Sequence, residues 1–171
     1  CWGQNPMGQA TVPSGLVAVS QISATGHHTC ALKADGTVAC WGDNEVGQTA
    51  VPDGLASVSQ ISSGYMHSCA LESDGTVVCW GAKDGIPWNY GQANVPAGLA
   101  SVVQISAGLM QTCALKTDRT LVCWGNGYTV PENLGAVTQV SVGVFGSCAL
   151  KADQSVICWG DNSYGEATVP D

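Results

Sequence analysis

The chain is built from tandem copies of one sequence unit of about 40 residues. Its first two copies match at more than half of their positions without a gap. A repeat of this length predicts a repeat architecture, in which each unit buries its apolar face against its neighbours. We treat residues 1–171 as a single repeat domain. The copies cover residues 1–39, 40–78, 79–122 and 123–157, with a partial copy at 158–171.

Each copy contains short segments typical of β-strands. In the first copy these are 17–24 (VAVSQISA), 28–33 (HTCALK), 37–42 (TVACWG) and 48–52 (QTAVP). Gly and Asp-Gly lie between them, and no stretch keeps a helical period over a useful length. Four short antiparallel strands per unit predict an all-β propeller, or an open arc of four-stranded blades. Residues 1–13 would supply the last two strands of a further blade, which makes about four and a half blades.

The nine cysteines recur in step with the copies, as four pairs ten residues apart with Cys1 left over. In the first pair, a three-residue hairpin loop at 34–36 places Cys30 directly opposite Cys40. Opposed residues at a non-hydrogen-bonded pair lie about 4.5 Å apart at Cα, within disulfide range. The alternatives are paired free thiols or, less well supported because no C-x-x-C occurs, a zinc site. We predict the cross-strand disulfides Cys30–Cys40, Cys69–Cys79, Cys113–Cys123 and Cys148–Cys158.

The composition excludes several classes of partner. The chain carries 5 Lys+Arg against 13 Asp+Glu, a net charge of −8. Five cations are too few for a surface that follows nucleic-acid phosphates or an anionic membrane. No apolar run approaches the roughly 18 residues that cross a bilayer, so membrane insertion is not expected. Because disulfides form in oxidising compartments, we expect a secreted or cell-surface protein.

Motifs of enzyme chemistry are missing from the sequence. It contains no H-E-x-x-H, G-x-S-x-G, phosphate-loop lysine or EF-hand loop, and its three histidines do not recur with the cysteines. With every cysteine except Cys1 predicted to be oxidised, no thiolate nucleophile is expected. We therefore expect no enzymatic activity, no cofactor and no metal site.

The repeated residues resemble those of a known family. The segments G-x-x-H-[ST]-C-A-L, D-G-T-V-x-C-W-G and G-Q recur along the chain and are similar to the regulator-of-chromosome-condensation repeat. The resemblance covers essentially the whole chain and implies blades of a β-propeller. The founding member is a nuclear exchange factor for a small GTPase, but the shorter copies, paired cysteines and acidic charge argue against exchange activity here. The chain is more similar to short-repeat bacterial extracellular relatives, which include a propeller-type β-lactamase inhibitor, and this implies a binding protein.

The copies differ most at two loops, which makes these loops the candidate binding residues. The residues just before each [ST]-C-A-L segment vary, and equivalent loops of a propeller emerge on one face. Alternatively, the Met and Phe side chains among them pack between blades. The third copy also has an insertion at 82–90, whose aromatics can bind a sugar or a protein, or else cover their own loop. The candidate ligand-binding residues are Tyr65, Met66, Leu109, Met110, Phe145, Trp88 and Tyr90.

Other recurring residues are expected to be structural. His28 and His67 share one position and are predicted to hydrogen-bond within their blades rather than bind a ligand. Arg119 and Gln154 replace the glycine of the hairpin turn, which costs roughly 1 kcal/mol each if φ is positive, or these copies adopt another turn. The C-W-G tryptophans are expected to pack the blades: Trp2, Trp41, Trp80, Trp124 and Trp159.

Two functions are consistent with these features. The first is an extracellular, non-catalytic binding module whose variable loops meet a protein or a glycan. The second is a structural subunit that assembles into a ring or an extracellular filament through the edges of its first and last blades. Because four and a half blades are few for a closed ring, the chain is either a fragment of a longer propeller or an arc that another chain completes.

Overall fold

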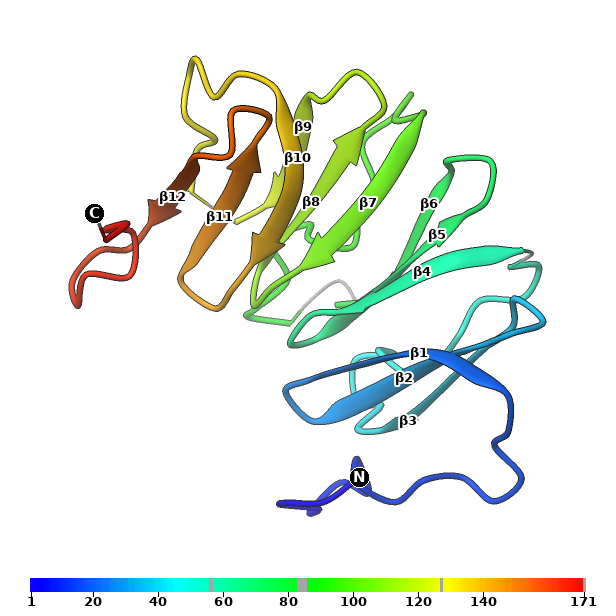
Figure 1. The fold of residues 1–171 in the computed structure, drawn as a ribbon. Helices are drawn as coiled ribbons and strands as arrows, with labels where there is room; N and C mark the ends of the chain where they lie inside the picture. Colours follow the sequence, from blue (N-terminus) through cyan, green and yellow to red (C-terminus); the bar gives the residue numbers. More distant parts are fainter. Residues whose placement is uncertain (56, 83–85, 127, 171) are drawn as a thin grey trace.

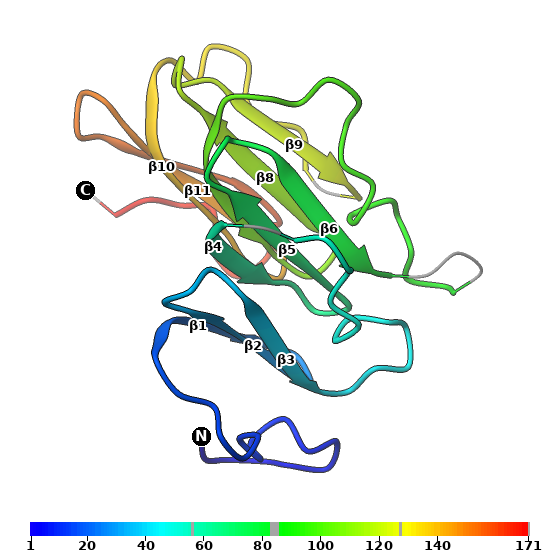
Figure 2. The ribbon, with the colours of Figure 1, turned by 90° about the vertical axis from the view of Figure 1, so that its right-hand side faces the viewer.

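The chain forms an open arc of small β-sheets. The computed structural model describes residues 1–55, 57–82, 86–126 and 128–170, and within them twelve strands form four antiparallel sheets of three strands each. The sheets follow one another in chain order along the arc, and the two termini lie at its opposite ends (Figures 1 and 2). In the described part of the chain, no helix is long and apolar enough to cross a membrane. The all-β propeller-type fold predicted from the repeats is confirmed.

Each sheet is a meander in which the second strand lies in the middle. A β-bulge near the start of each first strand shifts the register, and in β4 it brings Val58 and Ile61 to the same buried face. The strands are β1 (Val19–Thr25), β2 (His28–Lys33), β3 (Val38–Gly42), β4 (Val58–Ser63), β5 (His67–Glu72), β6 (Val77–Gly81), β7 (Val102–Ala107), β8 (Gln111–Lys116), β9 (Leu121–Gly125), β10 (Val137–Val142), β11 (Gly146–Lys151) and β12 (Val156–Gly160).

The hydrophobic core lies between consecutive sheets. Cys30 and Leu32 of β2 belong to the same buried cluster as Ile61 of β4. Two further clusters repeat this arrangement along the arc. Each sheet therefore buries its apolar face against its neighbours, as a repeat architecture requires.

One disulfide crosses each sheet between its second and third strands. Cys30 and Cys40 are register partners, with Cα atoms 4.1 Å apart, as the hairpin spacing predicts. Cys1 is exposed and unpaired. The prediction of one cross-strand disulfide per blade is confirmed; the other pairs are Cys69–Cys79, Cys113–Cys123 and Cys148–Cys158.

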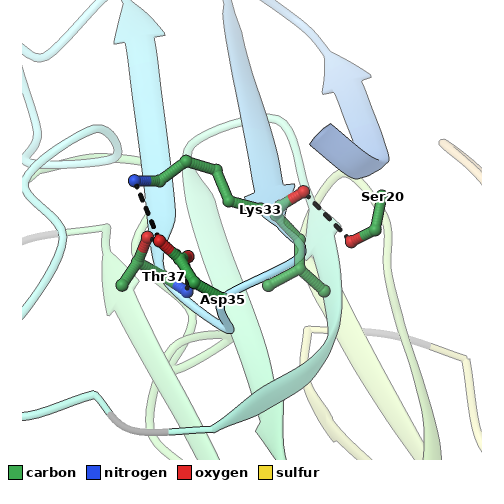
Figure 3. A network of polar contacts seen from close by, with 5 residues as sticks. Ser20, Lys33, Asp35 and Thr37 are labelled. Carbon is green, nitrogen blue, oxygen red and sulfur yellow. Dashed lines mark hydrogen bonds and ion pairs between the residues drawn. The ribbon is translucent and has the colours of Figure 1, made fainter. Parts of the chain in front are cut away.

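The hairpin tips keep one turn in all four sheets. Asp35 accepts hydrogen bonds from the backbone N and the Oγ1 of Thr37, at 3.0 and 2.6 Å, and forms an ion pair with Lys33 (Figure 3). Arg119 and Gln154 hold positive φ angles of 66° and 71° at the position that glycine occupies in the first two sheets. These two copies therefore keep the glycine turn and its backbone strain, rather than adopting another turn.

The prediction of a fourth strand at 48–52 is wrong, because this segment forms turns. Gly47 has a φ of 85° and donates its N–H to a carbonyl three residues earlier. The Gln48 carbonyl accepts hydrogen bonds from Trp80 Nε1 and Ser68 Oγ of the next sheet, both at 2.9 Å. The backbone is thus bonded in local turns and to the next sheet, and it does not extend the ladder of its own sheet.

The half blade expected at 1–13 is not formed either, since residues 1–18 contain no strand. This stretch turns like the later linking segments, and the Gln9 carbonyl accepts hydrogen bonds from Thr29 Oγ1 and Trp41 Nε1, at 3.0 and 2.9 Å. Residues 1–13 therefore cap the first sheet rather than build another.

The C-W-G tryptophans pack against the sheets, with one exception. Trp41, Trp80 and Trp159 are buried and Trp124 is half-buried, as predicted. Trp2 is 94% exposed, so the packing role expected for it is wrong. It lies outside the four sheets and has no second strand beside it.

Candidate binding surface

The two ends of the strands carry different loops. At one end, which we call the loop edge, each first strand turns back into the second, and each third strand ends. At the other end, the hairpin edge, each second strand turns into the third. The variable residues singled out by the sequence all belong to turns of the loop edge or to the insertion that follows β6.

The glycine of each C-W-G and the residue after it anchor the turns of the loop edge. Gly81 has a φ of 90°, and a Cβ there would lie 2.6 Å from the Met66 carbonyl, so the site requires glycine. That carbonyl accepts a hydrogen bond from Ala82 N at 2.8 Å. The variable turns are therefore anchored to rigid strands. The equivalent bonds in the next sheets are Asn126 N to Met110 O, at 2.9 Å, and Asp161 N to Phe145 O, at 2.8 Å.

Apolar side chains of the loop edge line one pocket of about 410 Å³. Three consecutive sheets and the insertion contribute to it. A volume of this size is within the range of ligand pockets in proteins. The polar groups of the lining side chains are the Tyr65 hydroxyl and the indole N–H of Trp88, and no charged side chain of the described residues lines it. The lining residues are Tyr65, Met66, Trp88, Leu109, Met110 and Phe145.

The pocket brings together six of the seven candidate residues, and their role in ligand binding stays a prediction. Tyr90 is 39% exposed and does not line the pocket. Phe145 is 54% exposed, and the Met and Phe side chains of the pocket belong to none of the buried clusters, so they do not pack between blades as core. Of the insertion at 82–90, residues 83–85 lie outside the described residues. Elsewhere in the described ranges, no cluster of His, Cys, Asp or Glu is large enough to hold a metal ion.

The buried histidines are structural, but they connect sheets instead of bonding within one. His67 Nε2 lies 2.8 Å from Thr112 Oγ1, and Thr112 donates its hydroxyl proton to the Gln92 carbonyl. His67 therefore donates from Nε2, and its Nδ1 has no partner. Desolvation by burial, with a smaller effect of His28, lowers the pKa of His67 to about 3. Burial likewise lowers the pKa of His28 to about 4, against a smaller opposing effect of Asp43.

A second connection between sheets, which we call the glutamine ladder, was not among the features predicted from the sequence. Gln21 Nε2 donates to the Ile61 carbonyl at 3.0 Å, and Ile61 N donates to Gln21 Oε1 at 2.9 Å. The side chain thus bonds both backbone groups of one residue in the next sheet. Its sequence signal is the triplet Q-[IV]-S, which recurs in all four first strands. The other pairs are Gln60 with Ile105 and Gln104 with Val140.

One known family matches the repeats of this chain. The family model of the regulator of chromosome condensation (RCC1) repeat matches residues 19–48, 58–92 and 137–166, which is more than half of the chain. This chain belongs to the RCC1 repeat family. No curated protein matches its sequence significantly.

Solved structures with the same fold include other proteins with RCC1-like repeats. The ectodomain of the receptor kinase CR4 from Physcomitrella patens is 28% identical over 84% of this chain, with a TM-score of 0.70. The CRINKLY WD40 ectodomain of the Arabidopsis thaliana receptor kinase ACR4 is 27% identical over 92%, with a TM-score of 0.68. Yeast RCC1 (Prp20), solved with Kap60 bound, shows the fold at 21% identity over 88%, with a TM-score of 0.71. The chain spans 39%, 57% and 46% of these three structures, respectively.

Proposed function

We propose that this RCC1 repeat chain is an extracellular, non-catalytic binding module whose ligand occupies the apolar pocket of the loop edge. The observation that carries the proposal is the convergence of six apolar side chains, from turns of three sheets and one insertion, on a single pocket. Variable apolar and aromatic residues on a rigid β scaffold are a common form of binding surface.

The chemistry of the pocket supports binding over catalysis. Among the described residues, its lining holds no carboxylate, imidazole or thiol that would act as a general acid, base or nucleophile. The nearest histidine in sequence, His67, is fully buried and is bonded to Thr112. A ligand that enters the pocket would instead bury its own apolar surface against the apolar lining.

The covalent structure supports an extracellular location. Four disulfides would not persist in a reducing cytosol. Two of the structural neighbours are ectodomains of plant receptor kinases. Yeast RCC1, which shares the fold, is seen with the protein Kap60 bound, which favours a protein as the ligand over a glycan.

The triple substitution Tyr65→Ser, Met66→Ser, Phe145→Ser tests the pocket. We expect it to weaken ligand binding by at least about 100-fold, because apolar and aromatic anchors at the centre of an interface carry most of its energy. The measurement is binding of the full chain to a displayed peptide library and to a glycan array. Because none of the three side chains is buried in the core, the variant should fold, and its circular dichroism spectrum should match that of the wild type.

A matched control substitutes three exposed valines away from the pocket, Val17→Ser, Val103→Ser and Val156→Ser. This control removes a similar amount of exposed apolar surface and should bind like the wild type. Ligands that bind the pocket variant as well as the wild type would contradict the proposal.

A second function, self-assembly, is supported by the ends of the glutamine ladder. Gln139 occupies the ladder position of β10 and is exposed, and no sheet of the described residues lies against it. At the other end of the arc Ile22 is 56% exposed, whereas its counterpart Ile61 is 2% exposed. A head-to-tail contact between two copies would place Gln139 of one against Ile22 of the other, with residues 158–170 of the first copy displacing residues 1–13 of the second from its first sheet.

A further inference from the structure

We infer that the pocket takes a protein segment in which an apolar anchor side chain is flanked by lysine or arginine. This inference rests on the proposed binding function and adds the chemical class of the ligand. Two properties of the loop edge carry it: an apolar lining, and a one-sided distribution of charge around that lining.

The positive charges of the described chain lie away from the pocket. Three lysines end the second strands at the hairpin edge, and each pairs with an aspartate two residues later, while an arginine sits at a hairpin tip. No lysine or arginine of the described residues lies at the loop edge. The four are Lys33, Lys116, Arg119 and Lys151, and the fifth cation of the chain, Lys83, belongs to the insertion and lies outside the described residues.

Acidic residues of the loop edge lie at both ends of the pocket. At one end, Asp43 N donates to the His27 carbonyl, and the His27 ring packs edge-on against Tyr65 at 5.9 Å between centroids. At the other end, Asp161 N donates to the carbonyl of Phe145 at 2.8 Å. The negative potential of this edge therefore brackets the apolar lining.

Two exposed glutamates extend the acidic ends. Glu45 follows Asp43 in the same loop, and its backbone N is bonded to the Asp43 carboxylate at 3.0 Å. Glu166 shares a shallow hollow with Phe145. Both side chains are exposed to solvent, so they act on a charged ligand through space.

The lining favours an amino-acid side chain over a sugar. A bound carbohydrate presents several hydroxyl groups, which lose hydrogen bonds with water unless the site replaces them. Here Tyr65 and Trp88 offer one polar group each. Met66 and Met110 instead provide flexible, polarisable thioethers, which adapt to aliphatic and aromatic side chains. An apolar anchor would fill the pocket while cations on either side meet the acidic loops.

The experiment selects binders from a random phage-displayed peptide library on the full chain, without prior depletion, and then measures each enriched peptide on the pocket variant Tyr65→Ser/Met66→Ser/Phe145→Ser. We expect the enriched peptides to share an aromatic or aliphatic anchor with lysine or arginine on its flanks. Synthetic copies of these peptides are then measured on the double variant Glu45→Gln/Glu166→Gln. Glutamine occupies the position of Glu166 in other copies, at Gln9 and Gln48, so this change keeps the local turn.

Affinity should fall about two- to tenfold in the double variant, mainly through slower association, and should fall with added salt. The matched control Asp53→Asn/Glu132→Gln removes the same charge from exposed linkers at the hairpin edge and should leave affinity unchanged. Peptides that need the pocket but show no basic flanks and no effect of the double variant would overturn this inference alone. Peptides that bind the pocket variant unchanged would overturn the proposed function itself. Binding confined to a glycan array would overturn the inferred ligand class.

Discussion

At the scale of single residues, the repeat uses buried polar side chains to connect sheets. His67 is fully buried and donates its Nε2–H to Thr112, and burial disfavours the charged form of its ring. Gln111 takes the same place in the third sheet, where its Oε1 accepts a bond from Ser147 at 3.1 Å. The position therefore needs a polar side chain that reaches the next sheet, and a histidine there adds a sensitivity to acid.

Acid should destabilise the fold through the two buried histidines. In the folded chain their pKa values are lowered to about 3 and 4 from the ordinary 6.5, so below pH 6.5 only the unfolded chain takes up these protons. The free energy of unfolding should then fall by roughly 1.4 kcal/mol per pH unit for each histidine between about pH 6 and pH 4. Urea unfolding at pH 7.5 and pH 5 measures this change.

The variant His67→Gln, which introduces the side chain that the third sheet carries at Gln111, is the matched control for this prediction. It keeps a polar group for Thr112 but does not titrate, so it should lose about half of the acid sensitivity. A variant with the same pH dependence as the wild type would show that other groups are responsible.

At the scale of the structural element, the disulfide hairpin is the unit that the chain repeats. The disulfide bridges directly opposed residues of a register that the three-residue tip defines. Its environment differs along the arc, because Cys69 is fully buried while Cys148 and Cys158 of the last sheet are half-buried. The same cross-link is thus part of the core in one sheet and near the surface in another.

Removing either of these disulfides should destabilise the chain by a different amount. Loop-closure entropy for ten residues contributes on the order of 2–3 kcal/mol in both cases. The substitution Cys69→Ala/Cys79→Ala should cost more than Cys148→Ala/Cys158→Ala, because it also leaves a cavity in a buried cluster. Thermal and denaturant unfolding of the two variants give the comparison, and equal losses would show that packing contributes nothing.

At the scale of the whole molecule, the arc is held by contacts that repeat from sheet to sheet. The glutamine ladder, the buried clusters and the linking-segment carbonyls each connect one sheet to the next. No such contact closes the arc between its two ends in the described structure (Figure 1). Both end faces therefore carry groups that elsewhere in the chain are paired.

Self-assembly through these faces predicts a mass that depends on concentration. Light scattering after size-exclusion chromatography should show oligomers of the wild-type chain, and Gln139→Ala should weaken the association by about tenfold, since both ladder bonds are lost. The variant Gln154→Ala, at an exposed hairpin tip, serves as the control. A wild-type chain that stays monomeric at high concentration would exclude assembly by this route.

Several features could be predicted from the sequence because their causes are local. The spacing of Cys30 and Cys40 and the turn between them determine the hairpin register, so the disulfides follow without knowledge of the neighbours. The φ angle of Arg119 was left open between the glycine turn and another turn, and the structure decides for the glycine turn. The family resemblance and the variable turns were likewise visible from the repeats.

Features that involve two sheets were decided only by the tertiary structure. Residues 48–52 have the composition of a strand, but the bonds of Gln48 to Trp80 and Ser68 favour turns, and these partners lie in the next copy. The partner of His67 was misassigned for the same reason. The pocket, too, exists only because the packing of successive sheets sets the distance between their turns. A repeat sequence determines what each unit forms alone, whereas contacts between units depend on a geometry that no single copy contains.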